Sequence, residues 1–245
     1  MPMMRATHRF SGAGIGSKGV GDVFWAEDEK NYLSVAELLA KPQSRSIVRD
    51  DSGTVCVVAS GPSAASESLD LCRKYATIAV NDSYRLAPWA DALYACDPQW
   101  WEHHIGAVRS GFSGELWTQD GATADKHGLN WIQGHHNPGL SDNPDYIHYN
   151  SNSGAQALNL AVLWGAKRLI LIGFDMKSEG SKRHWFGNHP GTLDKASDYR
   201  DWVQKFRIIA RDLKKMGVQV VNCSMNSALD CFEKRPLSAL EPTIS

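Results

Sequence analysis

The feature that most constrains the fold is a change of pattern at Thr54, where short apolar segments begin to alternate with segments of helical periodicity. The apolar segments of strand length are 54–59, 77–81, 91–96, 114–119, 146–149, 168–173 and 218–222. Strands joined through helices form parallel sheets, because the chain must cross over the sheet before it can run in the same direction again. The sequence therefore predicts an α/β fold with a mostly parallel sheet and crossover helices.

Two connecting segments have a clear helical pattern. Nearly every residue of 153–164 is small or apolar, which predicts a helix buried on most sides that ends at Gly165. In 198–216 the apolar residues recur at three- and four-residue spacing, and Gly217 is the expected stop.

The rest of the chain predicts three parts. Residues 1–52 form an N-terminal appendage with a flexible glycine-rich stretch at 11–23 and one helix at 27–41. Residues 53–235 form the α/β domain, and residues 236–245 form a C-terminal tail. The residues before Ser52 offer little to a core, so we expect the domain to fold without them.

Composition excludes several classes of protein. The 26 basic and 27 acidic side chains nearly cancel, which argues against non-specific nucleic-acid binding. No apolar run approaches the roughly 20 residues of a membrane helix, and the first residues lack the apolar region of a secretory signal. With five cysteines, an odd number found mostly in apolar segments, the sequence predicts a cytoplasmic protein with free thiols.

Polar groups follow the first three predicted strands. The turn Ser60-Gly61-Pro62-Ser63 lets the backbone approach a ligand closely, and the helix expected after it would direct free N–H groups at a phosphate. A tight strand-to-helix connection explains the same turn equally well. The next two strands end near Asn81 and Asp97, and in an open α/β sheet the ligand crevice lies at such ends.

A second polar group precedes the predicted helix at 153–164. The segment Asn150-Ser151-Asn152-Ser153-Gly154 caps this helix and is richer in polar residues than one cap requires, which favours a phosphate contact as well. The strand after that helix ends in Gly173-Phe174-Asp175. The Asp175 carboxylate suits a ribose or a divalent ion, and a purely structural turn is an equally good interpretation.

The loop from Arg183 to Gly191 is rich in histidine and aromatic residues, a composition that rarely serves packing alone. His189 is the best candidate for a general base because imidazole titrates near neutral pH, and His184 on the same loop is the second catalytic candidate. The adjacent pairs His103-His104 and His135-His136 lack the spacing of zinc ligands, so a structural zinc site is not expected.

The order of these motifs resembles that of bacterial lipooligosaccharide sialyltransferases, with the related motility accessory factors and 6-hydroxymethylpterin diphosphokinase-like proteins. The resemblance covers roughly residues 54–232. It rests on Gly61-Pro62-Ser63, Asn81, Ser153-Gly154, Gly173-Phe174-Asp175 and the loop from His184 to His189. Two features depart from the sialyltransferase pattern: Met176-Lys177-Ser178 replaces a segment with tyrosines, and Asn188 is an additional residue before His189.

The resemblance implies a single Rossmann-like domain that is a nucleotide-sugar-dependent glycosyltransferase with a CMP-sugar-like donor and a hydroxyl acceptor. Ser63, Asn81 and Ser153-Gly154 would hold the nucleotide, His189 would be the base, and Lys177 or Arg183 would offset phosphate charge. Magnesium is compatible with this chemistry but not required by it, and a homo-oligomer is compatible with the sequence. The alternatives are a pyrophosphokinase with Asp97 and Asp175 around magnesium, and a nucleotide-binding module without turnover.

Overall fold

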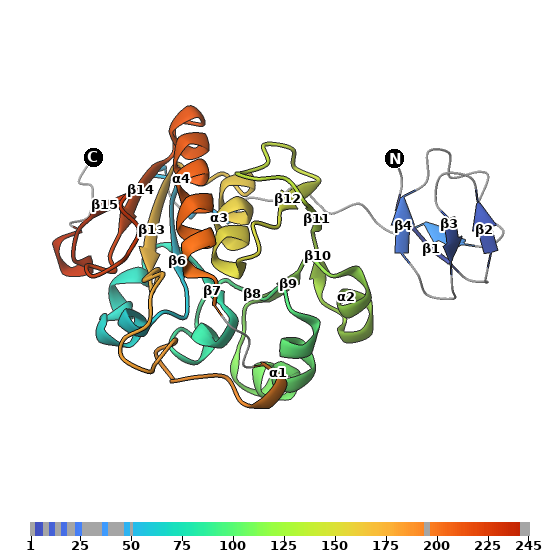
Figure 1. Ribbon diagram of the computed structural model, residues 1–245, viewed down its shortest axis with the longest axis horizontal. Helices are drawn as coiled ribbons and strands as arrows, with labels where there is room; N and C mark the ends of the chain where they lie inside the picture. Colours follow the sequence, from blue (N-terminus) through green and yellow to red (C-terminus); the bar gives the residue numbers. More distant parts are fainter. Residues whose placement is uncertain are drawn as a thin grey trace.

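The sheet at the centre of the protein has eight strands, in the order β10-β9-β8-β7-β6-β13-β14-β15 (Figure 1). The structure is a computed structural model that describes residues 47–49, 51–193 and 197–240, together with short strands at 3–6, 10–12, 16–18, 23–25 and 36–38. The eight strands are β6 (Thr54–Val58), β7 (Ala76–Val80), β8 (Ala92–Tyr94), β9 (Glu115–Thr118), β10 (Asn130–Trp131), β13 (Arg168–Ile172), β14 (Gln219–Asn222) and β15 (Glu233–Lys234). Every neighbouring pair is parallel, which confirms the predicted sheet.

The chain builds this sheet outward from β6 in two directions. Strands β6 to β10 follow one another to one edge, and the chain then returns to place β13 beside β6 and continues to β15 at the other edge. The order of the strands therefore reverses between β6 and β13. In open parallel sheets this reversal opens a crevice outside the carboxyl ends of the strands, where ligands bind.

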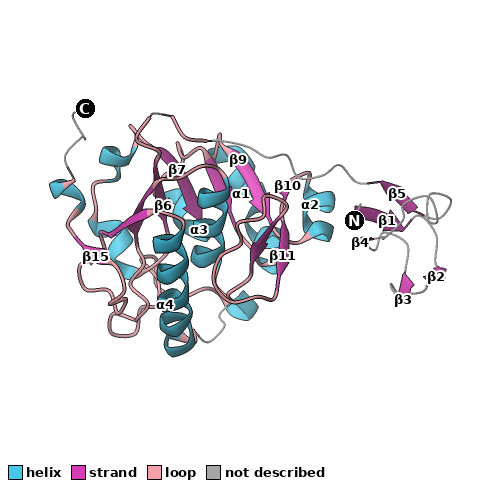
Figure 2. Cartoon of the chain, turned by 90° about the horizontal axis from the view of Figure 1, so that it is seen from above, coloured by secondary structure: helices cyan, strands magenta, loops and turns pink. Residues whose placement is uncertain are grey.

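Helices cover both faces of the sheet: α1 (Pro98–Gly111), α2 (Gly121–His127), α3 (Ser153–Leu163) and α4 (Tyr199–Lys215). Along β6, Val55 and Val57 pack in one apolar cluster with α3 and α4, which lie side by side (Figures 1 and 2). Cys56 and Val58 pack on the opposite face, in a cluster that includes side chains of α1. Strands buried on both faces are typical of parallel sheets, and they explain the nearly continuous apolar runs in the sequence.

The two predicted helices are confirmed. Residues 154–161 of α3 are all buried, and the helix ends before Gly165, whose φ of 96° is unfavourable for other residues. Helix α4 buries Phe206, Ile209 and Leu213, and Gly217 with φ 73° follows it. Tertiary contacts thus agree with the local apolar pattern in both helices.

One predicted strand has a different partner. Residues 146–148 form β12 (Tyr146–His148), which pairs with β11 (Gln133–His135) in a separate two-stranded parallel sheet. The Asn159 carboxamide of α3 accepts hydrogen bonds from Ser141 N at 2.9 Å and His148 N at 3.0 Å. These bonds hold the segment over α3 and away from the main sheet.

The N-terminal region contains strands in place of the predicted helix. Strand β1 (Met3–Ala6) pairs antiparallel with β4 (Val23–Trp25) and β5 (Ala36–Leu38), and β2 (Phe10–Gly12) pairs with β3 (Gly16–Lys18). The helix predicted for 27–41 is wrong at 36–38, because backbone pairing with β1 replaces helical hydrogen bonds there. The other residues of that prediction, and most of the glycine-rich stretch, lie outside the described residues.

Side chains beyond both predicted domain boundaries pack against the α/β domain. Ile47 and Val48 contact the apolar cluster that includes α3, and Arg49 pairs with Asp91. At the other end Leu237 is 2% exposed and Leu240 8%, both in the cluster that includes α1. These residues lie outside the predicted limits at 52 and 235, so we propose that the domain extends beyond both of them.

Two truncations test the N-terminal boundary. Deletion of residues 1–46 is expected to leave the denaturation midpoint unchanged, whereas deletion of residues 1–52 is expected to destabilise the domain by about 1–2 kcal/mol through lost burial of Ile47 and Val48. Urea denaturation of the two shortened chains beside the full chain measures both effects. Equal midpoints for the two truncations would show that these contacts do not stabilise the domain.

Two further predictions from the sequence concern the state of the cysteines and membrane-spanning helices. All five cysteines are free thiols, as predicted, and Cys56, Cys72 and Cys223 are buried. In the part of the chain that the structure describes, the helices are too short or too polar to cross a bilayer.

Candidate functional site

A cavity of about 360 Å³ lies at the carboxyl edge of the sheet, at the reversal between β6 and β13. The segments that follow β6, β7, β8 and β13 line it together with the start of α3, the start of α4 and the loop around His189. Ten of the thirteen residues predicted from sequence line this cavity: Ser60, Gly61, Asn81, Asp97, Ser153, Gly154, Lys177, Arg183, His184 and His189.

Three predicted residues lie elsewhere. Pro62, Ser63 and Asp175 line a neighbouring groove. Asp175 is 5% exposed, and its Oδ2 accepts hydrogen bonds from Ser63 Oγ at 2.9 Å and Ser63 N at 3.3 Å. Burial raises the pKa of Asp175, and the bonds from Ser63 act in the opposite direction. The carboxylate therefore joins the loops after β6 and β13, and it does not face the cavity as a ribose or metal ligand would.

Three N–H groups at the turn after β6, which the sequence predicted to be free, are bonded within the protein. Gly61 N donates to Gly173 O at 2.9 Å, Ser63 N to Asp175, and Ala64 N to Gly61 O at 3.1 Å. The predicted helix after the turn is a 3₁₀ segment, η2 (Pro62–Ser66). The interpretation as a tight connection is therefore correct for these backbone groups.

Gly61 is required for a close approach within the protein. A Cβ atom at this position would lie 2.1 Å from Asp175 Oδ2 and 2.4 Å from Gly173 O. Its φ of −63° is accessible to any residue, so space and not backbone conformation demands glycine. The sequence correctly indicated a close approach but assigned it to a ligand.

The N-terminus of α3 opens into the cavity. Asn152 caps the helix by accepting a hydrogen bond from Ala155 N at 3.0 Å. Within the described chain the N–H groups of Ser153 and Gly154 have no acceptor. Both residues line the cavity, so these groups and the positive end of the helix dipole are available to an anion.

Strained backbone gathers around the same cavity. Asn81, Ser151 and Met176 have φ values of 51°, 54° and 49°, a region that residues other than glycine seldom adopt, and all three line the cavity. Such conformations cluster at ligand sites, where the surrounding fold holds them. The Asn81 side chain forms no hydrogen bond to a described residue, and it lines the cavity.

The loop that carries the two candidate histidines is hydrogen-bonded to the turn after β6. His184 and Gly187 exchange backbone hydrogen bonds of 2.9 and 3.0 Å, and Trp185 N donates to Ser60 O at 3.1 Å. The rings of His184 and His189 lie 4.8 Å apart. These contacts hold both imidazoles at the wall of the cavity.

The two histidines differ in their surroundings. Burial, followed by the neighbouring His189, lowers the pKa of His184 to about 4, so His184 is neutral at pH 7. The His189 side chain is 13% exposed, and its Nδ1 lies 3.8 Å from Asp82 Oδ2. The Asp82 carboxylate thus lies beside the ring of His189, and its charge offsets only part of the effect of burial on the pKa of His184.

The pKa of His184 predicts a loss of stability in weak acid. The His184 side chain is protonated near pH 6.5 in the unfolded chain but only near pH 4 in the folded chain. The free energy of unfolding therefore decreases as the pH is lowered, by about 2 kcal/mol at about pH 5. His184→Phe retains an aromatic ring without this titration. Urea denaturation at about pH 7.5 and pH 5 is therefore expected to show a smaller loss in the variant, and equal losses in both proteins would contradict the assignment.

The sequence analysis did not identify two tryptophans and one carboxylate at the site. Trp100 and Trp202 line the cavity, although the apolar spacing of α4 assigns Trp202 to the core. Asp82 lies behind the cavity beside His189. Its position directly after Asn81 at the end of a strand was the signal that could have identified it.

No family model matches the chain, and no curated protein sequence matches it. A solved structure similar to the chain is that of the sialyltransferase CstII from Campylobacter jejuni, in complex with a substrate analogue, CMP-3FNeuAc. The two chains are 14% identical, and the superposition covers 75% of this chain and 86% of that one with a TM-score of 0.48. At this level of similarity the comparison assigns no role to any residue.

Proposed function

We propose that this protein is a transferase that binds a nucleotide-sugar in the cavity at the carboxyl edge of the sheet and transfers the sugar to an acceptor hydroxyl. One observation carries the proposal. Separate segments of the chain bring the side-chain amide of Asn81, a helix N-terminus at Ser153, cationic side chains at Lys177 and Arg183, and an imidazole at His189 to one cavity. Each of these groups has a task in such a reaction.

The proposed chemistry divides these groups between the leaving group and the acceptor. The acceptor oxygen attacks the anomeric carbon of the sugar while the bond from that carbon to the phosphate oxygen breaks. His189 takes the proton of the acceptor hydroxyl. Negative charge grows on the departing phosphate, where the α3 N-terminus, Lys177 and Arg183 stabilise it.

The pyrophosphokinase alternative has less support from the geometry. It needs Asp97 and Asp175 around one magnesium ion, but only Asp97 lines the cavity, and Asp175 is bonded to Ser63. No cluster of three or more histidine, cysteine or acidic side chains suited to a metal occurs among the described residues. A nucleotide-binding module without turnover uses the same cavity and differs only in yielding no product.

The nucleotide that is released distinguishes these chemistries. The protein is incubated with a CMP-sugar, a UDP-sugar, a GDP-sugar or ATP, each with and without magnesium, and ³¹P NMR follows the products. Release of CMP, UDP or GDP together with a glycosylated acceptor supports sugar transfer. AMP from ATP supports diphosphate transfer, and binding without any release supports the non-catalytic module. CMP-sugars come first because the sequence motifs resemble those of sialyltransferases.

Substitution of Asn81 tests the nucleotide site. Loss of its amide is expected to weaken nucleotide binding by about 1 kcal/mol, the usual value of one hydrogen bond, and calorimetric titration measures it. Asn81→Gly and Asn81→Ala form a matched pair, because both lack the amide but only glycine tolerates the φ of 51°. We therefore expect equal losses of affinity, with a lower melting temperature only for Asn81→Ala. Unchanged affinity in both would place the nucleotide elsewhere.

A further inference from the structure

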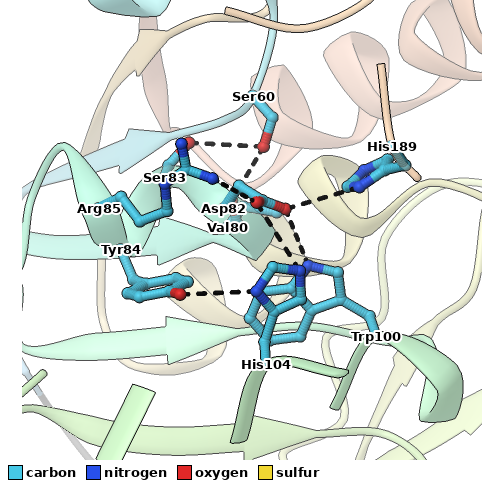
Figure 3. Close-up of polar contacts among 9 residues, drawn as sticks. All are labelled: Ser60, Val80, Asp82, Ser83, Tyr84, Arg85, Trp100, His104 and His189. Atoms are coloured by element: carbon cyan, nitrogen blue, oxygen red, sulfur yellow. Dashed lines mark hydrogen bonds and ion pairs between the residues drawn. The ribbon is translucent and has the colours of Figure 1, made fainter. Parts of the chain in front are cut away.

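Asp82 is a buried carboxylate that the sequence motifs do not explain. It is 2% exposed and follows Asn81 in the 3₁₀ segment η4 (Asn81–Arg85), directly after β7. Figure 3 shows its side chain at the centre of a group of polar residues. A charged group that is removed from water requires partners, and the identity of those partners indicates its role.

Two of its partners fix the carboxylate. Trp100 Nε1 donates to Asp82 Oδ2 at 2.9 Å, and Arg85 donates to Oδ1 at 3.2 Å. The segment that carries Asp82 is itself held to β6, since Ser83 Oγ donates to Ala59 O at 2.9 Å and Ser60 Oγ to Val80 O at 3.1 Å. The carboxylate therefore has a defined position independent of any ligand.

Two histidines face this carboxylate, and only one of them lines the cavity. His104 Nε2 lies 3.8 Å from Oδ1, but His104 stacks on Trp100 and burial lowers its pKa. His189 Nδ1 lies 3.8 Å from Oδ2, and His189 lines the cavity. These contacts connect a fixed carboxylate to His189 (Figure 3), which is one of the side chains that line the cavity.

We propose that Asp82 is a positioning residue that holds the Nδ1–H of His189 and leaves Nε2 as the nitrogen that receives the acceptor proton. This inference rests on the proposed function for its chemistry, but the contact with His189 can be tested alone. A distance of 3.8 Å is long for a hydrogen bond, and such contacts commonly tighten when substrate binds. The carboxylate would stabilise the imidazolium that forms when His189 accepts a proton.

Three other charged or titratable side chains lie near Asp82 and His189. Arg85 and His104 face the carboxylate, whereas His184 faces the ring of His189. Arg85 also lies over the rings of Trp185 and Phe186, so it links η4 to the loop that carries His189. Removal of the Asp82 charge would therefore change the tautomer of His189 while this link remains.

The test that needs no substrate is ¹⁵N NMR of the histidine side chains at about pH 8. The signals of His189 are assigned by their absence in His189→Ala. We expect a protonated Nδ1 and an unprotonated Nε2 in the unmodified protein, and a decrease of this tautomer in Asp82→Asn. His104→Gln is the matched control, because His104 contacts the same carboxylate from outside the cavity lining, and it is expected to leave the His189 tautomer unchanged.

The kinetic test follows once a donor turns over. Asp82→Asn is expected to lower kcat by about 10²- to 10⁴-fold with unchanged nucleotide affinity, and the double variant with His189→Ala should be no slower than His189→Ala alone. If Asp82 had only a structural role, Asp82→Asn would lower the nucleotide affinity and the melting temperature together. Its effect on kcat would then add to that of His189→Ala.

The outcomes separate this inference from the proposed function. Absence of turnover with every donor contradicts the proposed function, and the NMR experiment still decides the role of Asp82. A protonated Nε2 on His189 in the unmodified protein overturns the inference even if Asp82→Asn fails to fold. The same tautomer in Asp82→Asn and the unmodified protein also overturns it.

Discussion

Gly61→Val is expected to destabilise the domain by about 3 kcal/mol or more, at the upper end of the usual range for overpacked interiors. Its first added carbon would lie 2.1 Å from Asp175 Oδ2 and 2.4 Å from a backbone carbonyl, Gly173 O. Neither neighbour can move easily, because Gly61 N is bonded to that same carbonyl and Asp175 is bonded to Ser63. The sequence alone suggests a milder result, in which only ligand binding suffers.

Urea denaturation of Gly61→Val measures this loss. Gly106→Val is a suitable control, since no atom lies within 4 Å of a Cβ built at Gly106 in α1. We expect its stability to change by less than about 0.5 kcal/mol. A midpoint for Gly61→Val equal to that of the unmodified protein would show that the loops after β6 and β13 are not packed as described.

The second large effect is expected on turnover. A general base typically contributes 10²- to 10⁴-fold to a reaction, so His189→Ala should lower kcat by about that factor while the affinity for nucleotide changes little. The reason is that His189 acts on the acceptor proton and not on the nucleotide. Steady-state kinetics with the donor identified by product release, together with calorimetric titration, gives both quantities.

His184→Phe is the control for this experiment. It lies on the same loop, 4.8 Å from His189 between ring centres, and phenylalanine retains its aromatic packing. We expect its kcat to remain within about tenfold of the unmodified protein, because a histidine with a pKa of about 4 is neither charged nor an effective base at pH 7. Equal losses in the two variants would indicate that the histidines only hold the loop closed.

Local patterns determined which parts of the fold could be predicted. The apolar runs of β6 and β13 and the spacing in α4 are direct consequences of burial, and each predicted element lies within one or two residues of the observed one. Helix α1 was missed although Asp97 and Pro98 are a typical helix start, with Asp97 Oδ1 accepting from Gln99 N. The pairing of β12 depends on Asn159, a tertiary contact that no local pattern contains.

The candidate site likewise has a part that local patterns predict and a part that depends on tertiary contacts. Residues at the ends of parallel strands, such as Asn81 and Asp97, could be placed together because the topology brings those ends to one edge. The partner of Ser63 could not be predicted, since Asp175 is 112 residues away in the chain and satisfies the same groups that a phosphate would. A short polar turn does not reveal whether a ligand or another loop occupies it.

Amide chemical-shift mapping tests most directly whether the cavity binds a nucleotide. The ¹⁵N-labelled protein is titrated with CMP, then with UDP, GDP and ATP, and the amide signals are followed by two-dimensional NMR. The predicted result is a saturable change concentrated at the ends of β6, β7 and β8 and at the start of α3, with Asn81, Ser153 and Gly154 among the most affected residues. Changes confined to other surfaces, or none with any of the four nucleotides, would contradict the proposed site.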